Sequence, residues 1–372
     1  MTSMRAAPSA TIPEADRNDS ASSSPRELME HREAMWLAPL AKQSSNATRQ
    51  RIEAPSDVRT SYQRDRDRIV HSKSFRRLMH KTQVFVAPTG DHYRTRLTHT
   101  IEVAQIARTI GRAIGLNEDL IEAIVMGHDL GHTPFGHAGE TALQSYLPRF
   151  RHNEQSLRVV DLLEKDGQGL NLTDDVRDGI LHHSKPDHEL AEALSQRARS
   201  LEGEVVRMSD AIAYINHDLD DAIRASLIDP GDLPEVARHV LGTTHSQRID
   251  CLVTDIIHSS NTTVTPSEIR MSEGVLEAAN ALRRFLFDEV YRPLNETSNT
   301  QRAQRVVEML CAHFDTSFQG IPREFRRREQ VDTQQRIVAD WVASMTDRFA
   351  VETFERLYVP QFWSIPSHQM KD

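Results

Sequence analysis

The sequence has few of the features that mark secreted, membrane-spanning or disulfide-rich proteins. It contains only two cysteines, Cys251 and Cys311, which argues against a disulfide framework or a thiolate metal site and favours a reducing compartment. No apolar run approaches the roughly 20 residues that cross a bilayer, and the N-terminus lacks the continuous hydrophobic segment of a signal peptide. We therefore expect a cytoplasmic protein without a membrane partner.

Positive charge is in deficit, because the chain contains 45 Lys and Arg residues and 54 Asp and Glu residues, which gives a formal net charge of -9. An acidic chain has no general attraction to nucleic acid, so any phosphate binding must be local. One segment has a local excess of cations, namely Arg59, Arg64, Arg66, Arg68, Lys73, Arg76, Arg77 and Lys81. Such a run suits phosphate binding, and it also suits an exposed helix face.

Alternating runs rich in β-branched residues are rare, whereas apolar residues recur three and four positions apart through most of the chain. This pattern predicts an all-α protein. Residues 1–27 are rich in Ser, Ala, Pro and Asp, without apolar periodicity, and are predicted to form a disordered tail. The remainder, 28–366, is expected to be a single helical domain with a C-terminal helical extension at about 234–366.

The helical pattern is strongest in a few stretches. We expect helices at about Thr98–Ile114, Asn117–His128, Asn153–Asp166, Asp174–His183, Glu202–Ser226, Val275–Tyr291 and Gln301–Phe314. Asn117 is a plausible N-cap for the second of these helices. Three glycines and a proline between Gly131 and Gly139 cannot continue a regular helix, so a tight loop is expected there.

Four residues on the predicted apolar faces could bind a metal. His99 and His128 each fall in line with buried aliphatic residues, Asp129 follows His128 directly, and Asp210 lies on the apolar stripe of its helix. Each residue alone has an ordinary structural role as a core histidine, a cap or a paired carboxylate. Together, imidazoles and carboxylates are the usual ligands of a divalent ion, and three helices could bring them to one centre.

The sequence segments around these residues indicate a family more specifically than the four candidate ligands do. The pattern His99, His128-Asp129 and Asp210, with the flanking segments Arg96–Ala104, His128–Glu140 and His152-Asn153, resembles the HD-domain superfamily of metal-dependent phosphohydrolases. Within it, the sequence is similar to the bacterial deoxyguanosine triphosphate triphosphohydrolase-like family. The resemblance is closest over residues 58–226 and implies the helical HD fold with extra C-terminal helices.

The resemblance also implies a reaction: hydrolysis of dGTP or several deoxynucleoside triphosphates to deoxynucleoside and inorganic tripolyphosphate, by attack of a metal-bound water on the α-phosphorus. It implies one divalent metal per site, which could be Mn, Mg, Co, Fe, Ni or Zn, on His99, His128, Asp129 and Asp210. By the same resemblance, the catalytic residues are His137, Glu140 and His152. The substrate-binding residues it implies are Gln83, Arg96, His132, Tyr214 and Asp218.

Several alternatives stay open from the residues alone. His137 could merely hydrogen-bond the loop, Glu140 could begin a helix, and Tyr214 could be a structural tyrosine. The pair His182-His183 could serve a second metal, but it is expected to be structural or to support the first metal. A 5′-nucleotidase or phosphodiesterase of the same superfamily would share the ligands. Base preference, a nucleotide activator and binding of single-stranded DNA are not readable, and a homo-oligomer, either hexamer or tetramer, is expected from the resemblance.

Overall fold

The structure, a computed structural model, describes residues 23–83, 94–184, 197–265 and 267–360. Within these ranges the chain is helical, and strand-like pairing is limited to isolated bridges such as Thr82 with Thr95. The predicted all-α class is therefore confirmed. No helix in the described ranges is both long and apolar enough to cross a membrane. The tail predicted for residues 1–27 lies mostly outside the described residues.

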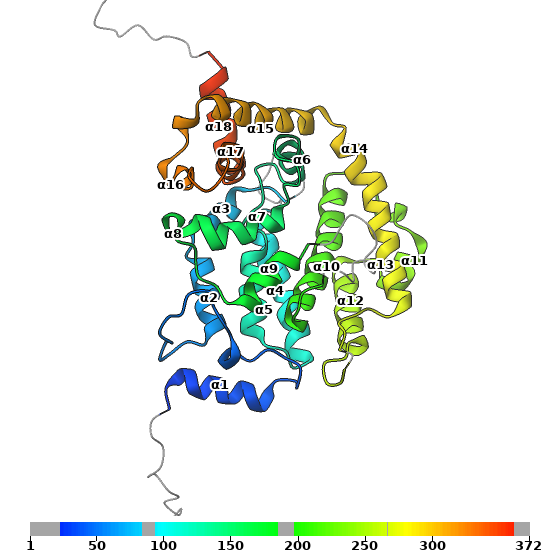
Figure 1. Cartoon of the computed structure of the whole chain (residues 1–372). Helices are drawn as coiled ribbons and strands as arrows, with labels where there is room; N and C mark the ends of the chain where they lie inside the picture. The colour runs from blue at the N-terminus through cyan, green and yellow to red at the C-terminus, as the bar shows by residue number, and fades with distance from the viewer. Residues whose placement is uncertain (1–22, 84–93, 185–196, 266, 361–372) are drawn as a thin grey trace, which may run out of the picture.

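Figure 1 labels the helices in chain order. Up to residue 224 they are α1 (Pro25–Trp36), α2 (Ser61–Val70), α3 (Lys73–Arg77), α4 (Arg96–Ala113), α5 (Glu118–His128), α6 (His137–Tyr146), α7 (His152–Arg158), α8 (Glu164–Gly167), α9 (Asp174–His182) and α10 (Leu201–Arg224). Beyond it they are α11 (Glu235–Leu241), α12 (His245–Ser259), α13 (Glu273–Leu286), α14 (Arg292–Asn295), α15 (Ser298–Thr316), α16 (Arg323–Arg326), α17 (Gln334–Ala343) and α18 (Asp347–Tyr358). Two π-helical turns, Val159–Leu163 and Phe287–Tyr291, follow α7 and α13.

Side-chain caps explain where the helices begin. Asn117 caps α5 as predicted, because its Oδ1 accepts from the backbone N–H groups of Asp119 and Leu120. Ser24 and Glu27 form a capping box at the start of α1. Helix α1 therefore begins at Pro25, inside the tail that was predicted to extend to residue 27. Ser24 and Pro25, which contribute to the Ser- and Pro-rich composition of that tail, are the N-cap and the first residue of the helix.

The loop between α5 and α6 (residues 129–136) is shorter than predicted. Phe135 and Gly136 have φ values of 63° and 56°, and this left-handed pair completes the turn within two residues. Helix α6 can then begin at His137, inside the segment predicted to be a loop. Gly139 belongs to its first turn, where a Cβ would stand 2.0 Å from the carbonyl oxygen of Pro134.

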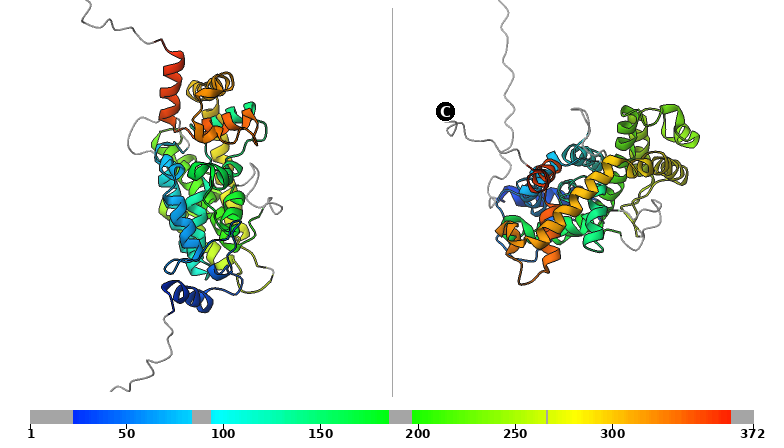
Figure 2. Two further views of the ribbon diagram at one scale, coloured as in Figure 1. Left: turned by 60° about the vertical axis from the view of Figure 1, so that its left-hand side comes forward. Right: turned by 90° about the horizontal axis from the view of Figure 1, so that it is seen from above.

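The hydrophobic core consists of two clusters. The first lies among α2, α4, α5, α9, α10, α12 and α13. The second joins α6 to the C-terminal helices α15, α17 and α18, which gather at the top of Figure 1. Figure 2 shows that α1 and α18 lie at opposite ends of the molecule. Residues 129–136 pass between the clusters, because they connect α5 in the first to α6 in the second.

Candidate metal centre and active site

Three helices bring the four predicted metal ligands together. His99 comes from α4, His128 from the end of α5, and Asp210 from α10, and one ligand atom from each lies within 4.8 Å of the other two. The Nε2 atom of His99 is 3.0 Å from Asp210 Oδ1, and that of His128 is 3.8 Å from the same oxygen. Asp129, the C-cap of α5, places its Oδ1 3.4 Å from His128 Nε2.

The tautomer of His128 fits a metal ligand. Its Nδ1 lies 2.6 Å from the carbonyl oxygen of Val125 and donates to it, so Nε2 carries the lone pair. This Nε2 is buried and has no hydrogen-bond partner within the described ranges. A buried lone pair beside the carboxylates of Asp129 and Asp210 is the donor set of a borderline divalent cation. The chain thus holds histidine and aspartate groups that could bind one.

The electrostatics keep both carboxylates ionised. Burial alone would raise the pKa of Asp129, but the neighbouring imidazoles of His128 and His132 and the guanidinium of Arg96 outweigh it and hold that pKa well below its usual range. Burial likewise opposes ionisation of Asp210, but its hydrogen bond with His99 and the neighbouring imidazole of His128 lower its pKa. Anionic carboxylates are the form that a cation requires.

Arg96 is buried beneath the metal ligands. Its Nη1 donates to Asp129 Oδ2 at 2.8 Å, and its Nη2 donates to the carbonyl oxygen of Gln83 at 3.2 Å. The side chain is 3% exposed. In this structure Arg96, predicted to bind substrate, holds the carboxylate of Asp129 and the backbone of Gln83.

The predicted catalytic residues lie together beside this centre. His137 is 54% exposed, and its Nδ1 stands 3.7 Å from Glu140 Oε2. His152 donates to Glu140 through both its backbone N–H, at 2.9 Å, and its Nδ1, at 3.1 Å. Burial would raise the pKa of Glu140, but His152 and His137 hold it well below its usual range. Glu140 is thus an anion shared by two histidines.

Two further histidines connect these groups. The ring of His132 stacks on that of His152 at 4.1 Å, and its Nε2 is 3.2 Å from Asp129 Oδ1. It is buried. His183 is buried with its ring 4.9 Å from that of His128, and burial lowers its pKa to about 3. His182 points elsewhere, toward Asp178.

Two of the predicted substrate-binding residues, Gln83 and Asp218, have a buried oxygen without a partner. Neither Gln83 Oε1 nor Asp218 Oδ1 has a hydrogen-bond partner among the residues that the structure describes. The ring of Tyr214 lies 6.4 Å from that of His137. Sequence reasoning missed Tyr291, whose hydroxyl donates to Asp218 Oδ2 at 2.5 Å and whose ring is 5.5 Å from that of Tyr214. Tyr291 comes from the π-helical turn after α13, and no local pattern marks it as a neighbour of α10.

The cation-rich segment mostly serves the fold. Arg59 and Arg66 pair with Asp67, and Arg64 and Arg68 pair with Glu53. Further along, Lys73 pairs with Glu324 and the fully buried Lys81 donates to backbone carbonyls. These arginines are held in ion pairs with carboxylates of the fold, but they do not form the exposed helix face that the run also suited, because Arg64 and Arg68 are only 17% exposed and Arg59 precedes α2.

Two family models match the chain. The HD domain matches residues 96–215, which contain all four predicted metal ligands. The phosphohydrolase-associated domain matches residues 269–356, in the C-terminal extension. The matched region and the observed geometry place the chain in the HD-domain class of helical proteins.

Proteins that are similar to this chain over almost its whole length define its family more narrowly. A protein from Caldanaerobacter subterraneus subsp. tengcongensis is 51% identical over 340 residues, which cover 91% of this chain and 97% of the relative. Proteins from Clostridium perfringens and Desulfatibacillum aliphaticivorans are each 45% identical, over 91% and 90% of this chain and 98% of their own length. All three are named deoxyguanosinetriphosphate triphosphohydrolase-like protein. The chain belongs to this family, which confirms the resemblance inferred from the sequence.

Proposed function

We propose that this protein is a metal-dependent triphosphohydrolase that converts deoxynucleoside triphosphates into deoxynucleoside and inorganic tripolyphosphate. The observation that carries the proposal is the meeting of two groups of side chains. His99, His128 and Asp210 form a candidate metal centre, and Asp129 Oδ1 lies 3.4 Å from His128 Nε2. The pair His137 and Glu140 is connected to Asp129 through the stacked rings of His132 and His152. The names of the relatives support the choice of substrate.

The four ligands would hold one divalent cation. When bound, such an ion supplies positive charge that polarises a phosphoryl group and makes an attacking water more acidic. Arg96 orients Asp129 from the opposite side through its 2.8 Å hydrogen bond. Outer partners of this kind usually contribute about 10–100-fold in metal affinity or activity.

His137 is the side chain placed to move a proton. Its Nδ1 faces the anionic Glu140, so its Nε2 is the nitrogen that can give or take a proton at the ligand. A positioned general acid or base contributes about 10²–10⁴-fold in rate. Glu140 fixes the ring, and His152 holds Glu140 from the other side.

The deoxyribose is proposed to bind next to Tyr214, with Gln83 Oε1 and Asp218 Oδ1, two buried oxygens without a partner among the described residues, as candidate contacts of its hydroxyl. A sugar hydroxyl would satisfy such acceptors, and a substrate without it would leave them unpaired. Burial also raises the pKa of Asp218 to about 7. The aromatic ring of Tyr214 would pack against the sugar.

Product analysis tests this proposal. The purified protein is incubated with each deoxynucleoside triphosphate and with mixtures, in the presence of Mg, Mn or Co, and the phosphate product is identified. Tripolyphosphate is expected. If no mixture yields tripolyphosphate, the proposal is wrong. Release of orthophosphate from a nucleoside monophosphate would indicate the alternative nucleotidase, and opening of a cyclic nucleotide would indicate the alternative phosphodiesterase.

A further inference from the structure

One carboxylate of the C-terminal extension connects two segments that flank the candidate active site. Asp347, the first residue of α18, accepts at Oδ2 from the backbone N–H of Thr82, at 3.0 Å, and from its hydroxyl, at 2.7 Å. Its Oδ1 accepts from the backbone N–H of Phe135 at 2.9 Å. Thr82 precedes Gln83, and Phe135 lies two residues before His137. The same side chain thus fixes both segments.

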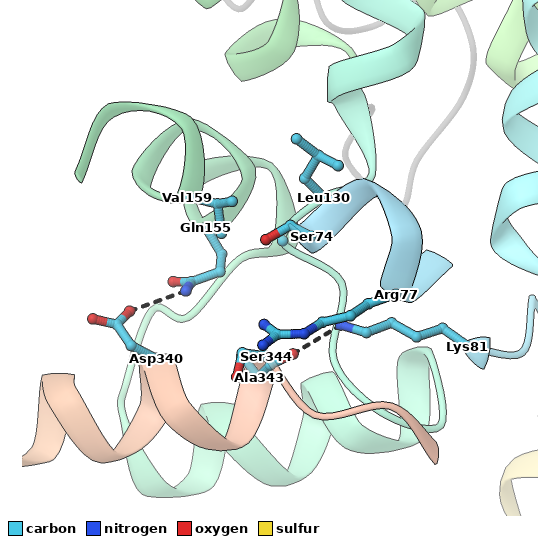
Figure 3. A pocket seen from close by; sticks show the side chains of 10 residues that line it. Ser74, Arg77, Lys81, Leu130, Gln155, Val159, Asp340, Ala343 and Ser344 are labelled. Atoms are coloured by element: carbon cyan, nitrogen blue, oxygen red, sulfur yellow. Dashed lines mark hydrogen bonds between the residues drawn. The ribbon is translucent and has the colours of Figure 1, made fainter. Parts of the chain in front are cut away.

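A buried ammonium group makes a second connection. Lys81 is 2% exposed, and its Nζ donates to the carbonyl oxygens of His132 and of Ala343, the latter at 2.9 Å. Figure 3 shows Lys81 extended toward Ala343 at the end of α17. A lysine buried this deeply requires such partners. The loop before α6 is therefore tied to the extension at both His132 and Phe135.

Packing behind the loop is nearly complete. The cavity in Figure 3 is lined by Leu130 and Gly131 of the loop and by Asp340 and Ser344 of the extension, and its volume is about 10 Å³. A space of this size holds about one water molecule. The loop therefore has little room to move toward the extension.

The loop needs this support because its backbone is strained. Phe135 is a non-glycine residue with a φ of 63°, a conformation that persists only when the surroundings determine it. A Cβ on the next residue, Gly136, would stand 3.1 Å from the carbonyl oxygen of Gln83. The turn that precedes His137 therefore packs closely against the segment that contains Gln83. Asp347 accepts hydrogen bonds from both of these segments, through Thr82 and Phe135.

We propose that Asp347, assisted by Lys81, is a positioning residue for hydrolysis: from the C-terminal extension it holds His137 and Gln83 in one geometry around the bound substrate. This inference rests on the proposed triphosphohydrolase function. It assigns to the extension a role in turnover as well as in stability. A small misplacement of reacting groups costs a large factor in rate.

The test compares Asp347→Ala with Asp332→Ala. Asp332 is a matched control in the same extension, because it is 14% exposed, pairs with Arg158 and Arg328, and makes no hydrogen bond or ion pair to residues 129–136 of the α5–α6 loop. We measure kcat and KM for tripolyphosphate release, bound metal by elemental analysis, and the folded fraction by urea unfolding. For Asp347→Ala, kcat per folded molecule is expected to fall by about 10–100-fold, with metal content unchanged. Asp332→Ala should lose stability and keep its kcat.

The isosteric change Thr82→Val supplies a second variant, because it removes only the hydroxyl that donates to Asp347. Here kcat should fall by about threefold or more while the folded fraction stays unchanged. Equal kcat values per folded molecule for Asp347→Ala and Asp332→Ala, or an unchanged kcat in Thr82→Val if Asp347→Ala does not fold, would overturn the inference. Failure of the proposed function is distinguishable, because the wild-type protein would then release no tripolyphosphate.

Discussion

At the scale of single residues, Asp129 has the most connections in the candidate site. Its two oxygens face His128, His132 and Arg96 at 3.4, 3.2 and 2.8 Å. Asp129→Ala is expected to abolish metal binding and to reduce turnover at least about 100-fold, because it removes a ligand and frees the arginine. Elemental analysis and the tripolyphosphate assay measure the two effects.

The same substitution leaves the buried Arg96 without its carboxylate, which costs about 3–5 kcal/mol of stability. Asp129→Asn is the control for this cost, since its amide oxygen can still accept from Arg96 while the negative charge is gone. Circular dichroism should report a folded helical protein for Asp129→Asn. Full activity with a normal metal content in either variant would show that the metal site is wrongly assigned.

At the scale of elements, the start of α10 contains a carboxylate that responds to pH. Glu202 Oε1 accepts from the backbone N–H groups of Lys42 and Asn117 at 2.9 and 3.2 Å, while Oε2 is buried without a partner. Burial raises the pKa of Glu202 from 4.5 to about 7. Between these two pH values the folded state binds more protons than the unfolded state, so this residue lowers stability as the pH rises.

The penalty from Glu202 grows from about pH 4.5 and is complete above about pH 7. Glu202→Gln removes the titration and preserves the shape of the side chain. Urea midpoints measured from about pH 5 to about pH 8 should therefore fall less steeply in the variant than in the wild type. Parallel pH profiles would refute the assignment.

A second element-scale feature is the π-helical turn Phe287–Tyr291, since such turns often occur at functional sites. Tyr291→Phe removes the hydroxyl donor to Asp218 but keeps the ring beside Tyr214. Loss of one hydrogen bond to a buried carboxylate should raise KM for the deoxynucleoside triphosphate about fivefold or more. Steady-state kinetics measure this change.

Tyr146→Phe is the matched control, because the Tyr146 hydroxyl also donates to a carboxylate, Asp315 Oδ1 at 3.0 Å, on the second hydrophobic cluster. Its KM should equal that of the wild type. If the two variants change KM alike, Tyr291 has no special role at the substrate.

At the scale of the whole molecule, features that depend on neighbouring residues in the sequence could be predicted, whereas contacts between residues far apart in the sequence could not. Periodicity and caps are local, so the burial of His99 and the cap at Asn117 were predicted correctly. Asp347 lies 265 residues from Thr82, and Arg66 pairs with Glu122 across 56 residues. No local pattern encodes such pairs. The resemblance to family motifs identified the candidate site residues, because such motifs combine residues that are distant in the sequence but meet in the fold.

The candidate site lies between the two hydrophobic clusters, because α4, α5 and α10 supply the proposed metal ligands while α6, in the second cluster, supplies His137 and Glu140. A buried ionic group joins the C-terminal helix α17 to α7. Asp340, with 2% of its side chain exposed, accepts from Arg158 at 2.7 Å and from Arg336 at 2.7 Å. Asp340→Ala leaves these arginines without their shared carboxylate and should lower the free energy of unfolding by about 3 kcal/mol.

The exposed pair Arg348 and Glu352 provides the contrast, because their side chains are 85% and 52% exposed. Glu352→Ala should change stability by less than about 0.5 kcal/mol, as solvent screens such pairs. Urea unfolding of both variants measures the difference. If Asp340→Ala were as stable as Glu352→Ala, the buried ionic group would not be what joins the extension to the core, and the hydrogen bonds of Asp347 and Lys81, together with burial of apolar side chains in the second cluster, would have to do so.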